Sequence, residues 1–313
     1  MKRFITFFAV VAAVLIAASC TKSEEYNADA ACETVSYTVS LSDAVQTRAF
    51  GEGTEVDKVF CGVYEKKGEG VYEYLEGSST EIALDSEKKA KFEPSLFSGR
   101  TYKIVFFAQC YGINNETPVY SVDKDNAIVS FPVNTSLFAN TESLDAFAFV
   151  DEIKVGTDAP EAAVLKRPFA QINIGCTATD FANATKLGET PAKSKVVLTG
   201  CYKSFDLLNN EPEGEVSELT YLTSALPEGT FKVAENEYNY LAMVYAIPGA
   251  TINCTIDIRT DSKSINEVTI ENVPAVANTR TNIYGNLMTG TVTYYVELSG
   301  FTGEDKTQQV PAE

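Results

Sequence analysis

The sequence contains no histidine and no tryptophan. Without histidine, a Ser–His or Cys–His catalytic pair, a histidine metal ligand and the commonest general base near neutral pH are all excluded. A pair of carboxylates is the acid–base arrangement that the composition still allows. No such pair stands out, because Asp123, Asp125 and Asn126 lie in a turn-like VDKDNA segment without the glycine and distal glutamate of a calcium loop. We therefore expect no enzyme, no metal site and no cofactor.

Basic residues are also few. The chain has 25 lysines and arginines against 43 aspartates and glutamates, which gives a formal net charge of −18. Its lysines are spread singly or in pairs and form no basic stripe, so nucleic acid is excluded as a partner. The acidic excess indicates solubility and self-repulsion and does not mark a substrate site.

Long apolar runs are lacking except at the start of the chain. Lys2 and Arg3 precede the apolar residues 4–16, and the small residues 17–19 (AAS) stand before Cys20. This order is typical of a secretory signal, and the run is shorter than the ~20 residues of a membrane-spanning helix. We expect the chain to be exported.

The junction at Cys20 resembles the lipobox of bacterial lipoproteins, which implies that the Cys20 thiol carries a lipid. Cleavage near Ser19, with Cys20 incidental, is the alternative. Residues 21–31 (TKSEEYNADAA) are too polar to form a packed core and are expected to act as a tether. Within them, residues 22–25 look like the acidic signal that directs lipoproteins of the Bacteroidetes to the outer face of the outer membrane, although a plain flexible leash would have the same composition. We expect a surface-exposed, lipid-anchored protein of the outer membrane.

The seven cysteines include no CxxC pair and no metal-like cluster. They are Cys20, Cys32, Cys61, Cys110, Cys176, Cys201 and Cys254. If Cys20 is lipidated, the remaining six permit three disulfides in an exported protein. However, four of them, Cys61, Cys110, Cys176 and Cys254, lie in apolar strand-like runs, where cysteine behaves as a small buried hydrophobe. We favour mostly unpaired core thiols.

Alternation of apolar and polar residues dominates the rest of the chain. Residues 35–41, 252–259 and 292–298 have apolar side chains at every second position, which predicts strands with one buried and one exposed face. Residues 260–263 (TDSK) lead to a further alternating segment around 268–270, which predicts an antiparallel hairpin. Other apolar runs predict strands buried on both faces, at 59–64, 102–111, 147–150, 196–198 and 241–247.

Helical patterns are sparse. The best candidate covers residues 180–187, with Thr179 or Asp180 as N-cap and Gly188 after its end. Short strands with so little helix predict an all-β chain of two tandem antiparallel β-sandwiches, with a boundary in the segment 154–160 (KVGTDAP). The expected parts are a signal peptide (1–20), a tether and leading strand (21–48), two sandwiches (49–155 and 156–301) and a polar tail (302–313).

Two segments and the start of the chain resemble one known family. The sequence LKRPFAQINI (165–174) opens the second half, and TRTNIYGNLMTG (279–290) stands before the last strand. Together with Cys20 they look like the fimbrillin-like surface lipoproteins of Bacteroidales, which are related to type V pilins. The resemblance covers most of the chain and implies two transthyretin-like β-sandwiches.

The resemblance also implies a mode of assembly. In such pilins an Arg-specific protease cuts after an arginine near the start of the first domain. Removal of the leading strand then opens a groove, which a strand of the next subunit fills. Arg48 and Ala49 occupy the matching place in this chain, directly after the 35–41 strand, and Gly51 and Gly53 are expected to keep this segment exposed. An ordinary surface arginine is the alternative.

An opened sandwich presents unpaired main-chain groups and an apolar slot, and one alternating strand satisfies both. Residues 292–298 are suited to be such a donor or complete their own domain, whereas the polar tail 302–313 is a poor donor. Two functions follow. The first is a fimbrial subunit, in which strand exchange joins it to other subunits. The second is a monomeric surface lipoprotein whose sandwich loops and tyrosines bind a glycan or a host protein.

Overall fold

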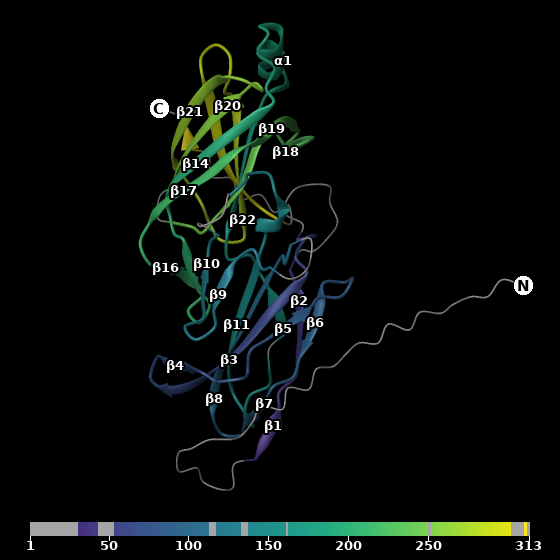
Figure 1. Cartoon of the computed structure of the whole chain (residues 1–313), viewed down its shortest axis with the longest axis vertical. Coiled ribbons are helices and arrows are strands. Elements are labelled where there is room, and N and C mark those ends of the chain that lie inside the picture. Colours follow the sequence, from purple (N-terminus) through teal and green to yellow (C-terminus); the bar gives the residue numbers. More distant parts are fainter. Residues whose placement is uncertain are drawn as a thin grey trace, which may run out of the picture.

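The computed structural model describes residues 31–42, 53–112, 117–132, 137–160, 162–249, 252–301 and 310–311. Regular structure in these residues is almost entirely β, and their one α-helix is α1 (Ala178–Lys186). The all-β prediction is therefore confirmed. Figure 1 shows an elongated molecule, with most strands of the first half of the chain in its lower part and most strands of the second half in its upper part.

The lower part is a sandwich of two sheets. One sheet has the order β11-β8-β3-β4, with β5 also paired to β3, and the other has the order β12-β2-β6. Strands β1 and β7 form a separate short pair. The bounds are β1 (Cys32–Thr34), β2 (Tyr37–Leu41), β3 (Lys58–Gly68), β4 (Val71–Tyr74), β5 (Thr80–Ala83), β6 (Lys89–Phe92), β7 (Ser95–Phe97), β8 (Thr101–Gln109), β11 (Phe147–Lys154) and β12 (Ala163–Leu165).

The upper part is a second sandwich. Its sheets have the orders β18-β19-β13-β22-β23-β24 and β17-β14-β20-β21. The bounds are β13 (Ala170–Cys176), β14 (Lys193–Cys201), β17 (Ser217–Ala225), β18 (Thr230–Val233), β19 (Asn236–Ala246), β20 (Ile252–Arg259), β21 (Ser264–Val273), β22 (Thr279–Asn286), β23 (Thr293–Gly300) and β24 (Val310–Pro311).

A small sheet of three-residue strands lies at mid-height, with the order β16-β15-β10-β9 (Figure 1). It combines strands from both halves of the sequence, since β10 pairs with β15. Its strands are β9 (Ser121–Asp123), β10 (Ile128–Ser130), β15 (Ser204–Asp206) and β16 (Glu211–Glu213), and a 3₁₀ turn, η1 (Glu142–Leu144), precedes β11.

Two large groups of buried apolar side chains fill these layers. One lies in the lower sandwich and includes Val59 and Phe106. The other fills the upper sandwich and also includes Phe60 and Phe107. Because neighbouring residues of β3 and β8 belong to different cores, both faces of these strands are buried, as the unbroken apolar runs predicted. Phe107 of β8 packs against Phe169 with ring centroids 6.5 Å apart, which joins the second core to the β11-β8-β3-β4 sheet of the lower part.

The hairpin predicted after residue 259 is confirmed, because β20 and β21 pair in antiparallel fashion. Two other pairings are parallel: β2 with β12, and β13 with β22. The first of these crosses the predicted boundary between residues 155 and 156, since β12 follows that boundary and β2 precedes it. The boundary itself stays a prediction.

Candidate functional site

The leading strand predicted at residues 35–41 lies inside the lower sandwich. The structure begins β2 at Tyr37, two residues later than the alternation begins. Thr38 of this strand is exposed, as a period of two requires when only one face of a strand covers a core. The buried residues, each with at most 8% of its surface exposed, are Val35, Tyr37, Val39 and Leu41.

Both edges of β2 are paired. Val39 lies opposite Ala90 of β6 on its antiparallel side and opposite Ala163 of β12 on its parallel side. Just after the strand, the Ser42 N–H donates to the Leu165 carbonyl at 2.8 Å. Loss of β2 would therefore expose main-chain groups on two neighbouring strands and open a slot into the core.

The size of this contribution can be judged from the buried side chains. Each large apolar side chain contributes ~1.5–3 kcal/mol on burial, so the four of this strand contribute roughly 6–12 kcal/mol. A typical domain is stable by only ~5–15 kcal/mol. Loss of β2 would therefore remove a large share of the stability of the lower sandwich.

The slot also contains a polar contact. The Tyr37 hydroxyl donates to Asp151 Oδ2 at 2.7 Å, and both residues are buried. Asp151 belongs to β11, on the opposite sheet of the lower sandwich. The Tyr37 ring meets Phe106 edge to face, with centroids 5.3 Å apart. Besides its main-chain pairing, the leading strand is thus held by packing and by a buried hydrogen bond to a carboxylate, a type that is stronger than a neutral one.

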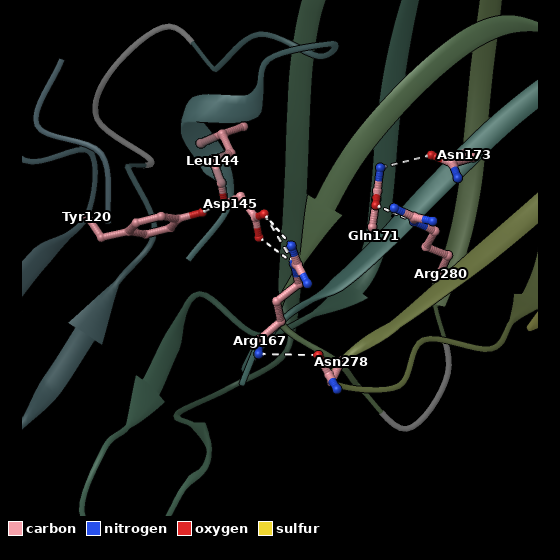
Figure 2. A network of polar contacts seen from close by, with 8 residues as sticks. All are labelled: Tyr120, Leu144, Asp145, Arg167, Gln171, Asn173, Asn278 and Arg280. Atoms are coloured by element: carbon pink, nitrogen blue, oxygen red, sulfur yellow. Dashed lines mark hydrogen bonds and ion pairs between the residues drawn. The ribbon is translucent and has the colours of Figure 1, made fainter. Parts of the chain in front are cut away.

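A buried ion pair lies where the two halves of the chain meet. The Arg167 guanidinium donates Nε to Asp145 Oδ1 at 2.9 Å and Nη2 to Asp145 Oδ2 at 2.9 Å (Figure 2). Burial raises the pKa of the Asp145 carboxyl, and Arg167 opposes this rise. The guanidinium also lies between two aromatic rings, 4.3 Å from the Phe147 centroid and 3.9 Å from that of Phe301. This stack connects the lower sandwich to the residue that follows the last long strand.

The two segments that carry the family resemblance lie side by side as β13 and β22, with Asn173 opposite Asn282. Their polar side chains form a chain of hydrogen bonds across the sheet, part of which Figure 2 shows. Asn173 Nδ2 donates to Asn282 Oδ1 at 2.9 Å, and Asn282 Nδ2 donates to Ser299 Oγ at 3.1 Å. On the other side, Arg280 Nε donates to Gln171 Oε1 and Gln171 Nε2 donates to Asn173 Oδ1, both at 3.2 Å. The two motifs are therefore one structural network.

The helix starts earlier than predicted. Thr177 is the N-cap, since its side chain accepts a hydrogen bond from Asp180 N–H, and neither Thr179 nor Asp180 has this role. The buried carboxylate of Asp180 instead accepts the N–H groups of Leu287, Met288 and Thr289 at 2.7–2.9 Å. The local sequence cannot show this role, because the N–H groups that donate to Asp180 lie 107 to 109 positions later in the chain. Asp180 thus joins residues 287–289, near the end of the segment 279–290, to α1.

The predicted lipidation residue Cys20 and the predicted cleavage pair Arg48–Ala49 lie outside the described residues. Asp123 is a turn residue, since its carboxylate accepts from Asp125 N–H at 3.0 Å and from Asn126 Nδ2 at 2.8 Å. Within the described ranges, no three or more Cys, Asp or Glu side chains gather as metal ligands would, and no helix is long and apolar enough for a bilayer span.

Cysteine placement follows the strand pattern. The thiols of Cys61, Cys176, Cys201 and Cys254 lie in buried strand positions, Cys110 is buried directly after β8, and none of these five is in a disulfide. Cys32 is exposed. Burial raises the pKa of the Cys254 thiol to about 12, so this group is an inert core residue at neutral pH.

A cavity of about 640 Å³ lies between β11, β12 and the β15–β16 hairpin. Its walls are mainly alanine, valine, proline and phenylalanine side chains, and its charged lining residues are Lys166 and Arg167. No carboxylate, hydroxyl or thiol lines it, so it offers no acid–base pair for catalysis. The candidate functional site is therefore the leading strand together with the slot, or groove, that this strand fills in the lower sandwich.

Comparison with known proteins gives one family match: residues 28–313 match the model of a family of unknown function, DUF6562. No curated protein is similar enough in sequence to count as a relative. Solved structures with a similar fold include a candidate cell adhesion protein from Bacteroides eggerthii, at 12% identity and a TM-score of 0.50, covering 85% of this chain and 95% of that one. A fimbrial assembly protein from Parabacteroides distasonis has 13% identity and a TM-score of 0.46, covering 90% and 100% of the two chains. At such identities the likeness concerns the fold.

Proposed function

Because the chain belongs to DUF6562, a family of unknown function, we propose its role from the structure: it is a subunit of a cell-surface fimbria that assembles by exchange of strands. In this proposal Cys20 carries a lipid that anchors the precursor in the outer membrane. Cleavage between Arg48 and Ala49 then releases the leading strand, and a strand from another subunit takes its place. The role is structural and adhesive, without catalysis.

The observation that carries the proposal is the burial of β2 between two strands that come from later parts of the chain. β2 precedes Arg48 in sequence, yet it lies between β6 and β12 and, together with Val35 just before it, fills the core with four side chains. Another extended segment with the same alternation can take over the main-chain pairing of such a strand, because this pairing does not depend on side-chain identity. The surface role is supported by the fold shared with the candidate cell adhesion protein of Bacteroides eggerthii.

The proposal is tested by treating the purified full chain with an Arg-specific protease. We expect mass spectrometry to find a new N-terminus at Ala49 and gel filtration to find oligomers. The variant Arg48→Lys keeps the charge and removes the cleavage site, so it should stay monomeric and folded. Arg259→Lys, a change at a surface arginine, is the matched control and should assemble normally. Oligomers that form equally well from Arg48→Lys would refute the proposal.

A further inference from the structure

The leading strand has a close counterpart near the other end of the chain. Residues 34–42 read TVSYTVSLS and residues 291–299 read TVTYYVELS, so six of nine positions are identical. The identical positions include all four that point inward in the leading strand, which gives both segments the pattern V-x-Y-x-V-x-L. The three differences fall at positions 36, 38 and 40, which lie on the outward face. The larger side chains Tyr295 and Glu297 would therefore meet solvent there and not the core.

The second copy of this pattern covers residues 292–298, which are Val292 and most of β23. β23 pairs along its whole length with β22, while its other edge is paired at two residues with β24. Val296 is buried, Tyr294 and Leu298 are half-buried, and Val292 is 38% exposed. A strand near the end of a sheet, with only a two-residue pairing on its outer side, is an element that subunits can exchange at low cost.

Asp151 distinguishes this groove from a purely apolar one. Its carboxylate is 8% exposed and accepts the Tyr37 hydroxyl. A strand with phenylalanine at this position would fill the same volume and leave the buried carboxylate one hydrogen bond short, which is costly inside a protein. An incoming tyrosine would restore that bond. The polar contact thus adds a chemical requirement to the requirement for shape.

From these observations we propose that Asp151 is a specificity-determining residue of the groove: it selects an incoming strand with the pattern V-x-Y-x-V-x-L, and the partner that supplies it is a second copy of this chain through residues 292–298. In that arrangement Tyr294 takes the place of Tyr37 on Asp151. Val296 takes the place of Val39 between Ala90 and Ala163, and Leu298 takes the place of Leu41 beside Leu165. Among the described residues the Tyr294 hydroxyl makes no hydrogen bond in its own sheet, so transfer would give it a partner.

This inference rests on the proposed function, since the groove opens only when the leading strand leaves. The test uses the full chain, cleaved by an Arg-specific protease in the presence of fluorescent peptides. The first peptide has the sequence of residues 291–299, the second replaces its Tyr294 by phenylalanine, and the third replaces its Tyr295 by phenylalanine as a matched control. Binding is measured by fluorescence polarisation after gel filtration, and the variant Asp151→Asn is measured in parallel.

We expect the first and third peptides to bind alike and the Tyr294→Phe peptide to bind about tenfold more weakly, as loss of a hydrogen bond to a charged group requires. In Asp151→Asn this preference should fall to about threefold or less. The comparison between peptides on the unaltered chain remains decisive even if Asp151→Asn folds poorly. Equal binding of all three peptides would overturn the role of Asp151 while strand acceptance stands. If no peptide binds the cleaved chain, strand acceptance fails, and the inference fails with it.

Discussion

The ion pair between Asp145 and Arg167 gives the sharpest test of the fold. In Arg167→Leu the carboxylate of Asp145 stays in a fully buried place without the guanidinium that now donates to both of its oxygens. Removal of one partner of a buried pair costs ~3–5 kcal/mol. We therefore expect the free energy of unfolding at neutral pH, measured in urea by far-UV circular dichroism, to fall by about this amount.

The loss should depend on pH in a defined direction. Burial already raises the pKa of Asp145, and Arg167 opposes the rise, so the pKa in Arg167→Leu must be higher still. A group whose pKa is raised on folding favours the folded state most below its unfolded pKa of ~3.9, and this contribution is lost as pH rises through the folded pKa. The difference in stability between Arg167→Leu and the unaltered chain should thus shrink as the pH falls from neutral toward 4.

Arg259→Leu is the matched control. Arg259 donates to Asp257 at 2.6 Å, but its side chain is 31% exposed, and such surface pairs contribute ~0–1 kcal/mol. We expect a loss of that size without a comparable dependence on pH. A loss below ~1 kcal/mol in Arg167→Leu, or a loss that stays constant between neutral and acidic pH, would refute the reasoning.

Three further predictions concern single positions. Asp180→Asn should destabilise the fold by ~1–3 kcal/mol in thermal unfolding, because its carboxylate accepts three main-chain N–H groups; Asp125→Asn, at an exposed turn, should be neutral. Gly175→Ala should cost ~1–3 kcal/mol, because its Cβ would lie 2.3 Å from the Phe231 ring, and an unchanged midpoint would contradict this packing. Cys254 should resist iodoacetamide at pH 8 until the chain unfolds, as mass spectrometry can show, since burial raises its pKa to about 12.

The sequence predicted the elements that have a strong period or a long apolar run. The alternation at 252–259 became β20, and the apolar run at 102–111 became β8. The strands of the small central sheet were missed, because three residues such as Ile128–Ser130 are too few to show a period. The sheet forms because β10 pairs with β15, which lies 74 or more positions later, and no local pattern encodes that pairing.

The leading strand could be recognised from its own residues, but its partners could not. The carboxylate that receives Tyr37 belongs to a strand 114 positions later in the chain. Asp151 stands at the end of an apolar run and has no motif of its own, so only the fold shows that it faces the core of the lower sandwich. Asp145 and Arg167 likewise belong to residue types that usually lie at the surface. Only the fold shows that they are buried together as a pair.

The parallel pairing of β2 with β12 has a consequence for folding. Synthesis from the N-terminus delivers β2 first, yet the pairing of Val39 with Ala163 cannot form until the first residues of the second half have also been made. Contacts between such distant residues form slowly, because a long loop must close first. The apolar face of β2 thus stays uncovered while the chain is being made, at the stage when a chaperone would have the most to protect.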